Sequence, residues 1–228
     1  MKLHIALFGV LPYLALASFV IGHIWRWRYD QFGWTTRTSQ LMEKRWLMWG
    51  SPIFHAGLLL LILGHATGLL IPASLTTWLG ISEETYHVIA LVGGLLAGSL
   101  VAIGLTLLLL RRFVTKARLR IVTRSADLVM YVLLALTASA GMIATIGVNM
   151  LGGGYNYRET ISVWLRSLFV ANPNIELMAS APWLYQTHAV LALALIAIWP
   201  YTRLVHLWSI PLGYLVRPPI VYHSPVRK

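Results

Sequence analysis

Five long, uncharged and mostly apolar stretches dominate the pattern of hydrophobic and polar positions along the chain. They cover Leu3–Trp25, Trp46–Ile71, Tyr86–Leu110, Leu128–Leu151 and Ala181–Thr202. Each one meets the length of roughly 20 residues that a helix needs to cross a hydrocarbon core about 30 Å thick. All are far longer than the roughly ten alternating residues of a barrel strand, and backbone groups in lipid must bond within their own segment. The pattern therefore predicts five transmembrane helices.

The connections between these stretches are too short to hold a separate soluble domain, so we expect residues 1–228 to form a single domain. The predicted fold class is an all-α membrane protein, a five-helix bundle. The first stretch resembles a signal peptide, because Lys2 precedes an apolar run and Ala15-Leu16-Ala17 resembles a cleavage site. Cleavage there would leave a strongly apolar new terminus, and we expect the stretch to be retained as a helix.

Composition supports the membrane assignment and excludes several classes of protein. Hydrophobic residues make up 58% of the chain and charged residues only 11%, whereas soluble domains carry about 25% charged residues. The net charge of +11 therefore does not indicate a soluble nucleic-acid-binding protein, and we expect no nucleic-acid partner. The sequence contains no cysteine, which excludes a disulfide scaffold, a cysteine-ligated iron–sulfur cluster and a thiol nucleophile in this chain.

The positive charge is distributed unevenly among the connections. Fifteen of the 18 Lys and Arg residues follow the first, third and fifth stretches: Arg26, Arg28, Arg37, Lys44, Arg45, Arg111, Arg112, Lys116, Arg118, Arg120, Arg124, Arg203, Arg217, Arg227 and Lys228. Basic residues remain on the cytoplasmic side of a membrane. The distribution predicts a multi-pass protein of the cytoplasmic (inner) membrane, with the N-terminus outside, the C-terminus inside and a basic inner face that suits anionic lipids or a docking partner.

Four histidines lie within or next to two of the predicted spans. His55 and His65 belong to the second stretch, which runs outward, and His188 and His206 to the fifth stretch and its inward continuation, which runs inward. The opposite directions bring His55 level with His206 near the inner face and His65 level with His188 toward the outer face. The axial separations differ, at about 15 Å for ten helical residues and about 27 Å for eighteen, so a helix tilt or a bend at Pro200 must absorb the difference.

Two opposed imidazoles inside a dry bundle are the ligands that a six-coordinate b-type haem requires. We therefore predict two haems b, one held by His55 and His206 and the other by His65 and His188. Small residues near the ligands, Gly57, Gly64, Ala66 and Gly68, would let a flat ring approach the helix. The alternative is that these histidines bond neighbouring helices or line a proton path. Zinc is disfavoured, because no third ligand lies level with either pair.

The long outer connection contains an amphipathic segment. Ile161, Trp164, Leu165, Leu168 and Phe169 follow a helical spacing and share one face. We expect a short helix on the outer membrane surface, and the alternative is a lid over a site at that surface.

Several of these motifs resemble the cytochrome b (gamma) subunit of membrane-bound respiratory nitrate reductases. They are Leu63-Gly64-His65-Ala66, His188-Ala189-Val190-Leu191, the run from Pro200 to Pro211, Trp27-Arg28-Tyr29-Asp30 and Thr38-Ser39-Gln40. The resemblance covers nearly the whole chain, and its most specific part is Arg203-Leu204-Val205-His206 with Trp208-Ser209. It implies two b haems, quinol oxidation near the outer haem, and electron delivery to an iron–sulfur subunit and a molybdenum-containing catalytic subunit on the cytoplasmic side.

The resemblance also bears on His87 and on three arginines. His87 stands where the family has a basic residue implicated in its quinol site, and this sequence has His there instead of Lys. An imidazole can accept a quinol proton, whereas Lys would mainly donate, so His87 is a candidate base; the alternative is an interfacial histidine. Arg111, Arg112 and Arg203 lie at the inner span ends, where they could pair with haem propionates. Their alternative role is that of ordinary snorkelling residues.

Two further functions are compatible with the sequence. One keeps the diheme bundle but attaches it to another reductase complex, of the sulfite-reducing or heterodisulfide-reducing type. The other is a haem-free proton-coupled transporter that uses the histidines for protons. It would give a colourless protein, and the chain lacks the internal repeat common among transporters.

Overall fold

The structure is a computed structural model, and it describes residues 1–34, 42–115, 121 and 123–209. All regular structure in this part of the chain is helical, and five helical runs are long and apolar enough to cross a membrane. These runs are Lys2–Tyr29, Arg45–Leu70, Glu83–Thr115, Ser125–Met150 and Trp183–Tyr201. The predicted all-α membrane fold with five spans is therefore confirmed.

The five runs are built from the following elements, several of which contain a turn of another helix type. The first contains α1 (Lys2–His4), a π-helical stretch (Ile5–Val10) and α2 (Leu11–Tyr29), and the second is α3 (Arg45–Leu70). The third contains α5 (Glu83–Leu110) and a π-helical end (Arg111–Thr115), and the fourth α7 (Ser125–Ala144) and a π-helical end (Thr145–Met150). The fifth contains α10 (Trp183–Ile198) and a 3₁₀ turn (Trp199–Tyr201), followed by a second 3₁₀ segment (Arg203–Ser209).

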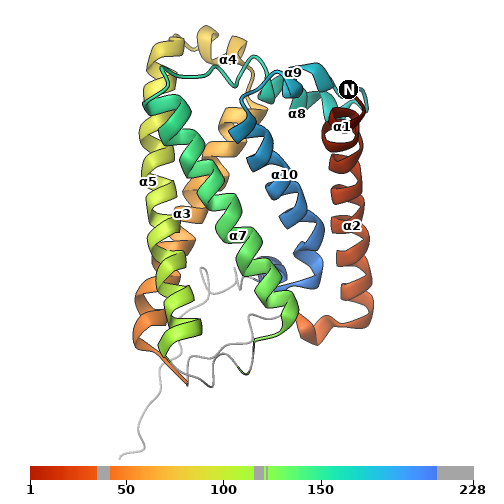
Figure 1. The fold of residues 1–228 in the computed structure, drawn as a ribbon, viewed down its shortest axis with the longest axis vertical. Helices are drawn as coiled ribbons and strands as arrows, with labels where there is room; N and C mark the ends of the chain where they lie inside the picture. Colours follow the sequence, from red (N-terminus) through yellow and green to blue (C-terminus); the bar gives the residue numbers. More distant parts are fainter. Residues whose placement is uncertain (35–41, 116–120, 122, 210–228) are drawn as a thin grey trace, which may run out of the picture.

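The bundle has two halves, with α3 packed along α5 and α10 lying between α7 and α2 (Figure 1). Glycines allow the close approach of α3 and α5: a Cβ atom at Gly57 would lie 2.7 Å from the backbone nitrogen of Val101, and one at Gly104 would collide with the backbone of Phe54. Small residues at a helix interface let two backbones approach closely in a membrane. Gly57 therefore packs against α5. Our prediction that it makes room for a flat ring is wrong.

The end of the bundle that holds the N-terminus is covered by three short helices, α4 (Ala73–Trp78), α8 (Ile161–Phe169) and α9 (Ile175–Ala179) (Figure 1). The amphipathic segment forms α8 as expected, and Ile161 and Trp164 pack with Phe8 and Met178 in a buried cluster. Phe169 is an exception, because its side chain is exposed. The helix covers this end of the bundle through its apolar face.

Two polar side chains of α8 also bond the end of α3. The hydroxyl of Ser162 donates to the carbonyl of Gly68 at 2.9 Å, and Arg166 donates to the carbonyl of Leu69 at 3.0 Å. The last carbonyls of a helix have no partner within the helix, so these bonds satisfy the end of α3 and fix α8 across it.

At the opposite end, where α3 begins and α5 ends (Figure 1), ion pairs connect the helices. Arg111 lies 2.8 Å from Glu43, and Arg203 lies 2.7 Å from Asp127, and all four side chains are nearly buried. Seven other basic residues of the predicted inner face lie outside the described residues: Arg37, Lys116, Arg118, Arg120, Arg217, Arg227 and Lys228. The same holds for Thr38-Ser39-Gln40 and Pro211 of the family motifs.

Candidate haem and quinol sites

The four candidate ligands form two pairs across the bundle, between α3 and the fifth span. The ring centres of His65 and His188 lie 6.0 Å apart with 27° between their planes. The ring centres of His55 and His206 lie 6.1 Å apart with 73° between their planes. The structure thus brings together the histidines that we matched from the sequence by their depth.

Each of the four imidazoles is oriented by a hydrogen bond from Nδ1 to a backbone carbonyl. His55 and His65 bond the carbonyls one turn earlier in α3, those of Ser51 and Leu61, both at 2.8 Å. His188 bonds the carbonyl of Thr137 in α7 at 3.0 Å, and His206 bonds that of Arg203. A carbonyl only accepts, so Nδ1 carries the proton and a neutral ring keeps the Nε2 lone pair for another partner.

This arrangement fits a metal held between two axial imidazoles. Two metal–nitrogen bonds of about 2 Å each, together with half the width of each ring, separate two ring centres by about 6 Å. Histidines that bind metals usually donate their other ring N–H to a carbonyl or carboxylate. No hydrogen bond among the described residues occupies any of the four Nε2 atoms, and an unpartnered polar atom at membrane depth is costly.

The donor sets contain two histidines each and no more. Within the described residues, no group of three or more His, Cys, Asp or Glu side chains comes together. Two ligands are too few for a structural zinc site, whereas they are the full axial set of a six-coordinate b-type haem. The residues present therefore fit haem.

The chain reaches His206 through a break in the fifth span. Helix α10 ends at Ile198, the 3₁₀ turn Trp199–Tyr201 follows, and Thr202 is extended, with φ −116° and ψ −174°. Pro200 lies inside the turn, where it has no N–H to continue the hydrogen-bond ladder. The bend that we expected at Pro200 is therefore present as a break in the helix, which accounts for the unequal spacing of the candidate ligands. The chain then continues to Ser209 as a 3₁₀ segment.

Glycine brings His188 close to α7. A Cβ atom at Gly141 would lie 2.9 Å from Cε1 and 3.1 Å from Nδ1 of His188. The sequence analysis did not identify Gly141, because no motif in the sequence relates the fourth span to the candidate ligands. Of the glycines that we did single out, Gly64 has no neighbouring atom within 4 Å, whereas a Cβ atom at Gly68 would lie 2.8 Å from the hydroxyl of Tyr157. Gly68 thus makes room for a tyrosine and not for a ring cofactor.

All three candidate propionate partners are engaged with protein groups, and Arg111 pairs with Glu43 as described above. Arg203 forms two parallel bonds of 2.7 Å with the carboxylate of Asp127, and Arg112 donates to the hydroxyl of Thr123 at 2.7 Å. Burial by itself lowers the pKa of Arg203, but the hydrogen bond to Asp127 and the charges nearby outweigh it and raise the pKa above its usual value. Because the carbonyl of Arg203 also accepts from His206, this arginine connects the His55/His206 pair to α7.

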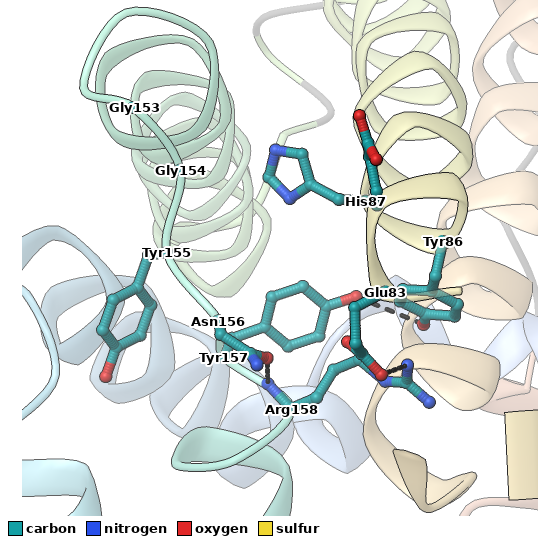
Figure 2. Close-up of a pocket in the computed structure, with 10 residues that line it drawn as sticks. Glu83, Tyr86, His87, Gly153, Gly154, Tyr155, Asn156, Tyr157 and Arg158 are labelled. Carbon is teal, nitrogen blue, oxygen red and sulfur yellow. Dashed lines mark hydrogen bonds and ion pairs between the residues drawn. The ribbon is translucent and has the colours of Figure 1, made fainter. Parts of the chain in front are cut away.

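His87 lines a cavity of about 340 Å³ at the end of the bundle that holds the N-terminus (Figure 2). The first turn of α5 forms one wall, with Glu83, Glu84 and Tyr86, and residues 153–158 form the other. A Cβ atom at Gly154 would lie 3.2 Å from the ring of His87, and Gly154 has a φ of +92°. Glycine adopts this conformation without strain, so it brings the loop backbone against the imidazole.

Part of the lining of this cavity is a network of aromatic and charged side chains. The hydroxyls of Tyr86 and Tyr157 lie 3.3 Å apart, and the buried guanidinium of Arg158 stacks 3.8 Å from the ring centre of Tyr86. Arg158 also pairs with Glu83 at 2.8 Å. Burial and the hydrogen bond with Tyr86 raise the pKa of Tyr157 above its usual value, so its hydroxyl stays protonated.

The amphipathic segment, whose alternative role was a lid over an outer site, does not line the cavity. Trp164 belongs to the buried cluster, and its indole N–H donates to the carbonyl of Phe8 at 2.9 Å. The residues that line the cavity instead, Tyr155, Asn156, Tyr157 and Arg158, lie in an irregular connection without periodicity. Sequence patterns gave no signal for their position.

The family model and the similar proteins found by comparison all have nitrate reductase names. A family model described as nitrate reductase gamma subunit matches residues 4–225. The nitrate reductase-like protein NarX of Mycobacterium tuberculosis is 50% identical over 216 residues, which are 94% of this chain but 33% of that protein. The nitrate reductase gamma chain of Bacillus subtilis is 41% identical, covering 96% of this chain and 97% of its own length. The respiratory nitrate reductase 1 gamma chain of Escherichia coli is 30% identical, with 94% and 95% covered.

Proposed function

This chain belongs to the nitrate reductase gamma subunit family, and from that premise we propose that it is the diheme b-type cytochrome subunit of a respiratory nitrate reductase. In this role it anchors the complex in the cytoplasmic membrane and connects quinol oxidation at the outer face to a cytoplasmic partner. The chain spans about a third of the mycobacterial relative and nearly the whole of the two gamma chains. The observation that carries the proposal is the pair of opposed histidines at each of two depths.

His65 and His188 would hold the haem nearer the outer face, and His55 and His206 would hold the haem nearer the inner face. When bound, the two irons supply one-electron redox centres at two depths in the membrane. The backbone bond at each Nδ1 fixes the tautomer that presents Nε2 to a metal. Arg112 and Arg203, at the inner end, are the candidate partners for propionate groups.

Quinol binds in the cavity beside His87. Oxidation of one quinol to quinone releases two protons and two electrons, and the haems that the two histidine pairs would hold would supply one-electron acceptors between this cavity and the partner. His87 accepts a proton from a quinol hydroxyl. The cavity lies about one helical turn beyond His65, because Gly68, three residues after His65, lies against the hydroxyls of the cavity residues Tyr86 and Tyr157. Glu83 and Glu84, both exposed at its rim, provide acceptors from which the protons reach the outer water.

The partners are an iron–sulfur subunit that receives the electrons and a molybdenum-containing catalytic subunit that reduces nitrate. Both dock on the basic inner face, which also attracts anionic lipids. The family match favours this complex over the sulfite-reducing and heterodisulfide-reducing types. A gamma subunit that carries no nitrate site supplies electrons and membrane attachment, and the partner carries out the reduction.

The direct test is the haem content of the purified chain. A pyridine haemochrome assay on folded, detergent-solubilised protein should give about two haems b per chain, and the dithionite-reduced spectrum should show low-spin bands. Folded full-length protein without colour would overturn the proposal and favour a haem-free role for the histidines.

A further inference from the structure

A line of three residues on α2 contacts the break in the fifth span. Ser18, Gly22 and Arg26 are spaced by four residues and therefore lie on one face of the helix. The hydroxyl of Ser18 donates to the carbonyl of Ala197 at 2.7 Å. In a 3₁₀ turn this carbonyl would bond the N–H of residue 200, which is a proline without one. Ser18 therefore satisfies a carbonyl that the break leaves without a backbone partner.

Gly22 brings α2 directly against the proline. A Cβ atom at this position would lie 2.7 Å from Cβ of Pro200 and 2.9 Å from the hydroxyl of Tyr201. A larger residue here would have to push either α2 or the break aside. The close approach places the next residue of the line, Arg26, beside the freed carbonyls.

Arg26 donates hydrogen bonds to the backbone before and after Tyr201, at the break. Its guanidinium donates to the carbonyls of Pro200 at 2.7 Å and Thr202 at 3.0 Å, and also to the carbonyl of Gly33 at 2.6 Å. Asp30, one turn later, lies 3.3 Å from its Nε atom. The residue is only 6% exposed, and unsatisfied carbonyls at such a depth are costly. One arginine thus satisfies the backbone on either side of Tyr201.

The chain is also held after the candidate ligand. The indole N–H of Trp208 donates to Nε2 of His23 at 3.0 Å, and the hydroxyl of Ser209 donates to the carbonyl of Trp34 at 3.1 Å. His23 donates in turn to the carbonyl of Phe19 at 2.6 Å. Both sides of His206 are therefore attached to α2 and the turn that follows it.

We propose that Arg26 is a positioning residue for the haem ligand His206, acting by holding the chain break at Pro200. The proposal rests on the proposed function, because it concerns the haem held by His55 and His206. Arg26 does not contact the ligand ring. It fixes the backbone between Pro200 and Thr202, from which the segment Arg203–Ser209 carries His206 to its place opposite His55.

The experiment replaces Arg26 by Gln in the full chain and measures haem content, optical redox titration and the low-spin EPR signals. We expect a fall of about 10-fold or more in affinity for the inner haem, or a shifted potential and EPR signal of that haem, with the outer haem unchanged. Arg28→Gln is the matched control, because Arg28 lies two residues away, carries the same charge and is exposed. It should leave both haems as in the wild type.

Two further variants separate positioning from general loss of folding. Gly22→Leu displaces Pro200 by contact and should change the same haem as Arg26→Gln, while Arg26→Lys should restore part of the wild-type signal. The outer haem reports folding within each sample. If both haems of Arg26→Gln keep the wild-type potentials and spectra, the proposal is overturned. It is also overturned if Arg26→Lys and Gly22→Leu each change the outer haem as much as the inner one. Absence of haem from the wild type would instead overturn the proposed function.

Discussion

His65 and His188 face each other with their ring centres 6.0 Å apart, although 123 positions of the chain separate them. Neither ring depends on the other for its orientation, because His65 bonds the carbonyl of Leu61 in its own helix and His188 bonds that of Thr137 in α7. The pair is therefore held in position by three helices. Because both Nδ1–carbonyl bonds leave Nε2 free of the backbone, the bundle itself presents the two lone pairs.

Single substitutions of the four histidines should fall into two groups. Replacing His65 or His188 by Ala should remove the outer haem, and replacing His55 or His206 should remove the inner one, because the pairs share no ligand. Optical spectra and redox titrations of the four variants measure this grouping. If His55 and His65 proved to be ligands of the same haem, the assignment by depth would be wrong.

Gly141→Ala should weaken the outer haem alone. The added Cβ atom would lie 2.9 Å from the His188 ring, so the ring must leave the carbonyl of Thr137, and loss of such a supporting bond costs about 10-fold or more in metal affinity. Haem content and the spectrum of each haem provide the measurement. Gly147→Ala is the control on the same span, where the nearest atom to a new Cβ is 4.0 Å away. Equal effects of the two variants would mean that helix propensity, and not His188, is responsible.

Asp127→Asn should destabilise the end of the bundle where α3 begins and α5 ends. Asp127 accepts two bonds from Arg203 and one from the backbone N–H of Arg124 at the start of α7. Breaking a buried ion pair by removing one partner costs about 3–5 kcal/mol, because the other charge remains buried. Thermal unfolding in detergent, followed by tryptophan fluorescence, measures the loss. Glu176→Gln, at an exposed carboxylate, should stay within about 0.5 kcal/mol of the wild type.

The ion pair of Glu43 and Arg111 should make stability depend on pH. Burial by itself raises the pKa of Glu43, but the hydrogen bonds from Trp46 and Arg111 and the charge of Arg111 outweigh it and hold the pKa below its usual value. A lowered native pKa stabilises the folded state above the ordinary glutamate pKa of about 4.3, and the contribution disappears as the pH falls through the native pKa. The difference in free energy of unfolding between the wild type and Glu43→Gln should therefore shrink on acidification. A difference that grows at low pH would contradict this reasoning.

The sequence predicted the spans and which candidate ligands lie opposite each other, because both follow from local properties. Apolar length defines a span, and the opposite directions of α3 and α10 are enough to make His65 level with His188. The path of the chain to His206 does not follow from local properties, because the break at Pro200 is stabilised by Arg26, which is 174 positions away. A proline in an apolar run indicates a bend, but it does not reveal which distant side chain satisfies the freed carbonyls.

The cavity beside His87 was predictable only in part. The position of His87 at the start of a span indicated a site at the outer face. The opposite wall depends on two glycines with positive φ, Gly153 and Gly154, and on Arg158, which reaches back to Glu83 and Tyr86. These contacts join segments about 75 residues apart in an irregular connection, where no hydrophobic period specifies the fold.

The final prediction concerns His87 and the oxidation of quinol. His87 lines the cavity together with Tyr86 and Tyr157, whose hydroxyls bond each other, and its ring lies against the backbone at Gly154. Since His87 is not in either histidine pair, His87→Ala should leave both haem spectra and dithionite reduction intact. It should slow haem reduction by quinol by about 10²-fold or more, as expected for loss of a general base. Stopped-flow reduction with a quinol analogue measures this rate.

His4→Ala is the control for His87→Ala, because His4 lies at the same end of the bundle but stacks on Phe8. The inner haem should be reduced only after the outer one. Unchanged quinol kinetics would remove His87 from the site, and inner-haem reduction that survives loss of the outer haem would place quinol oxidation at the opposite face.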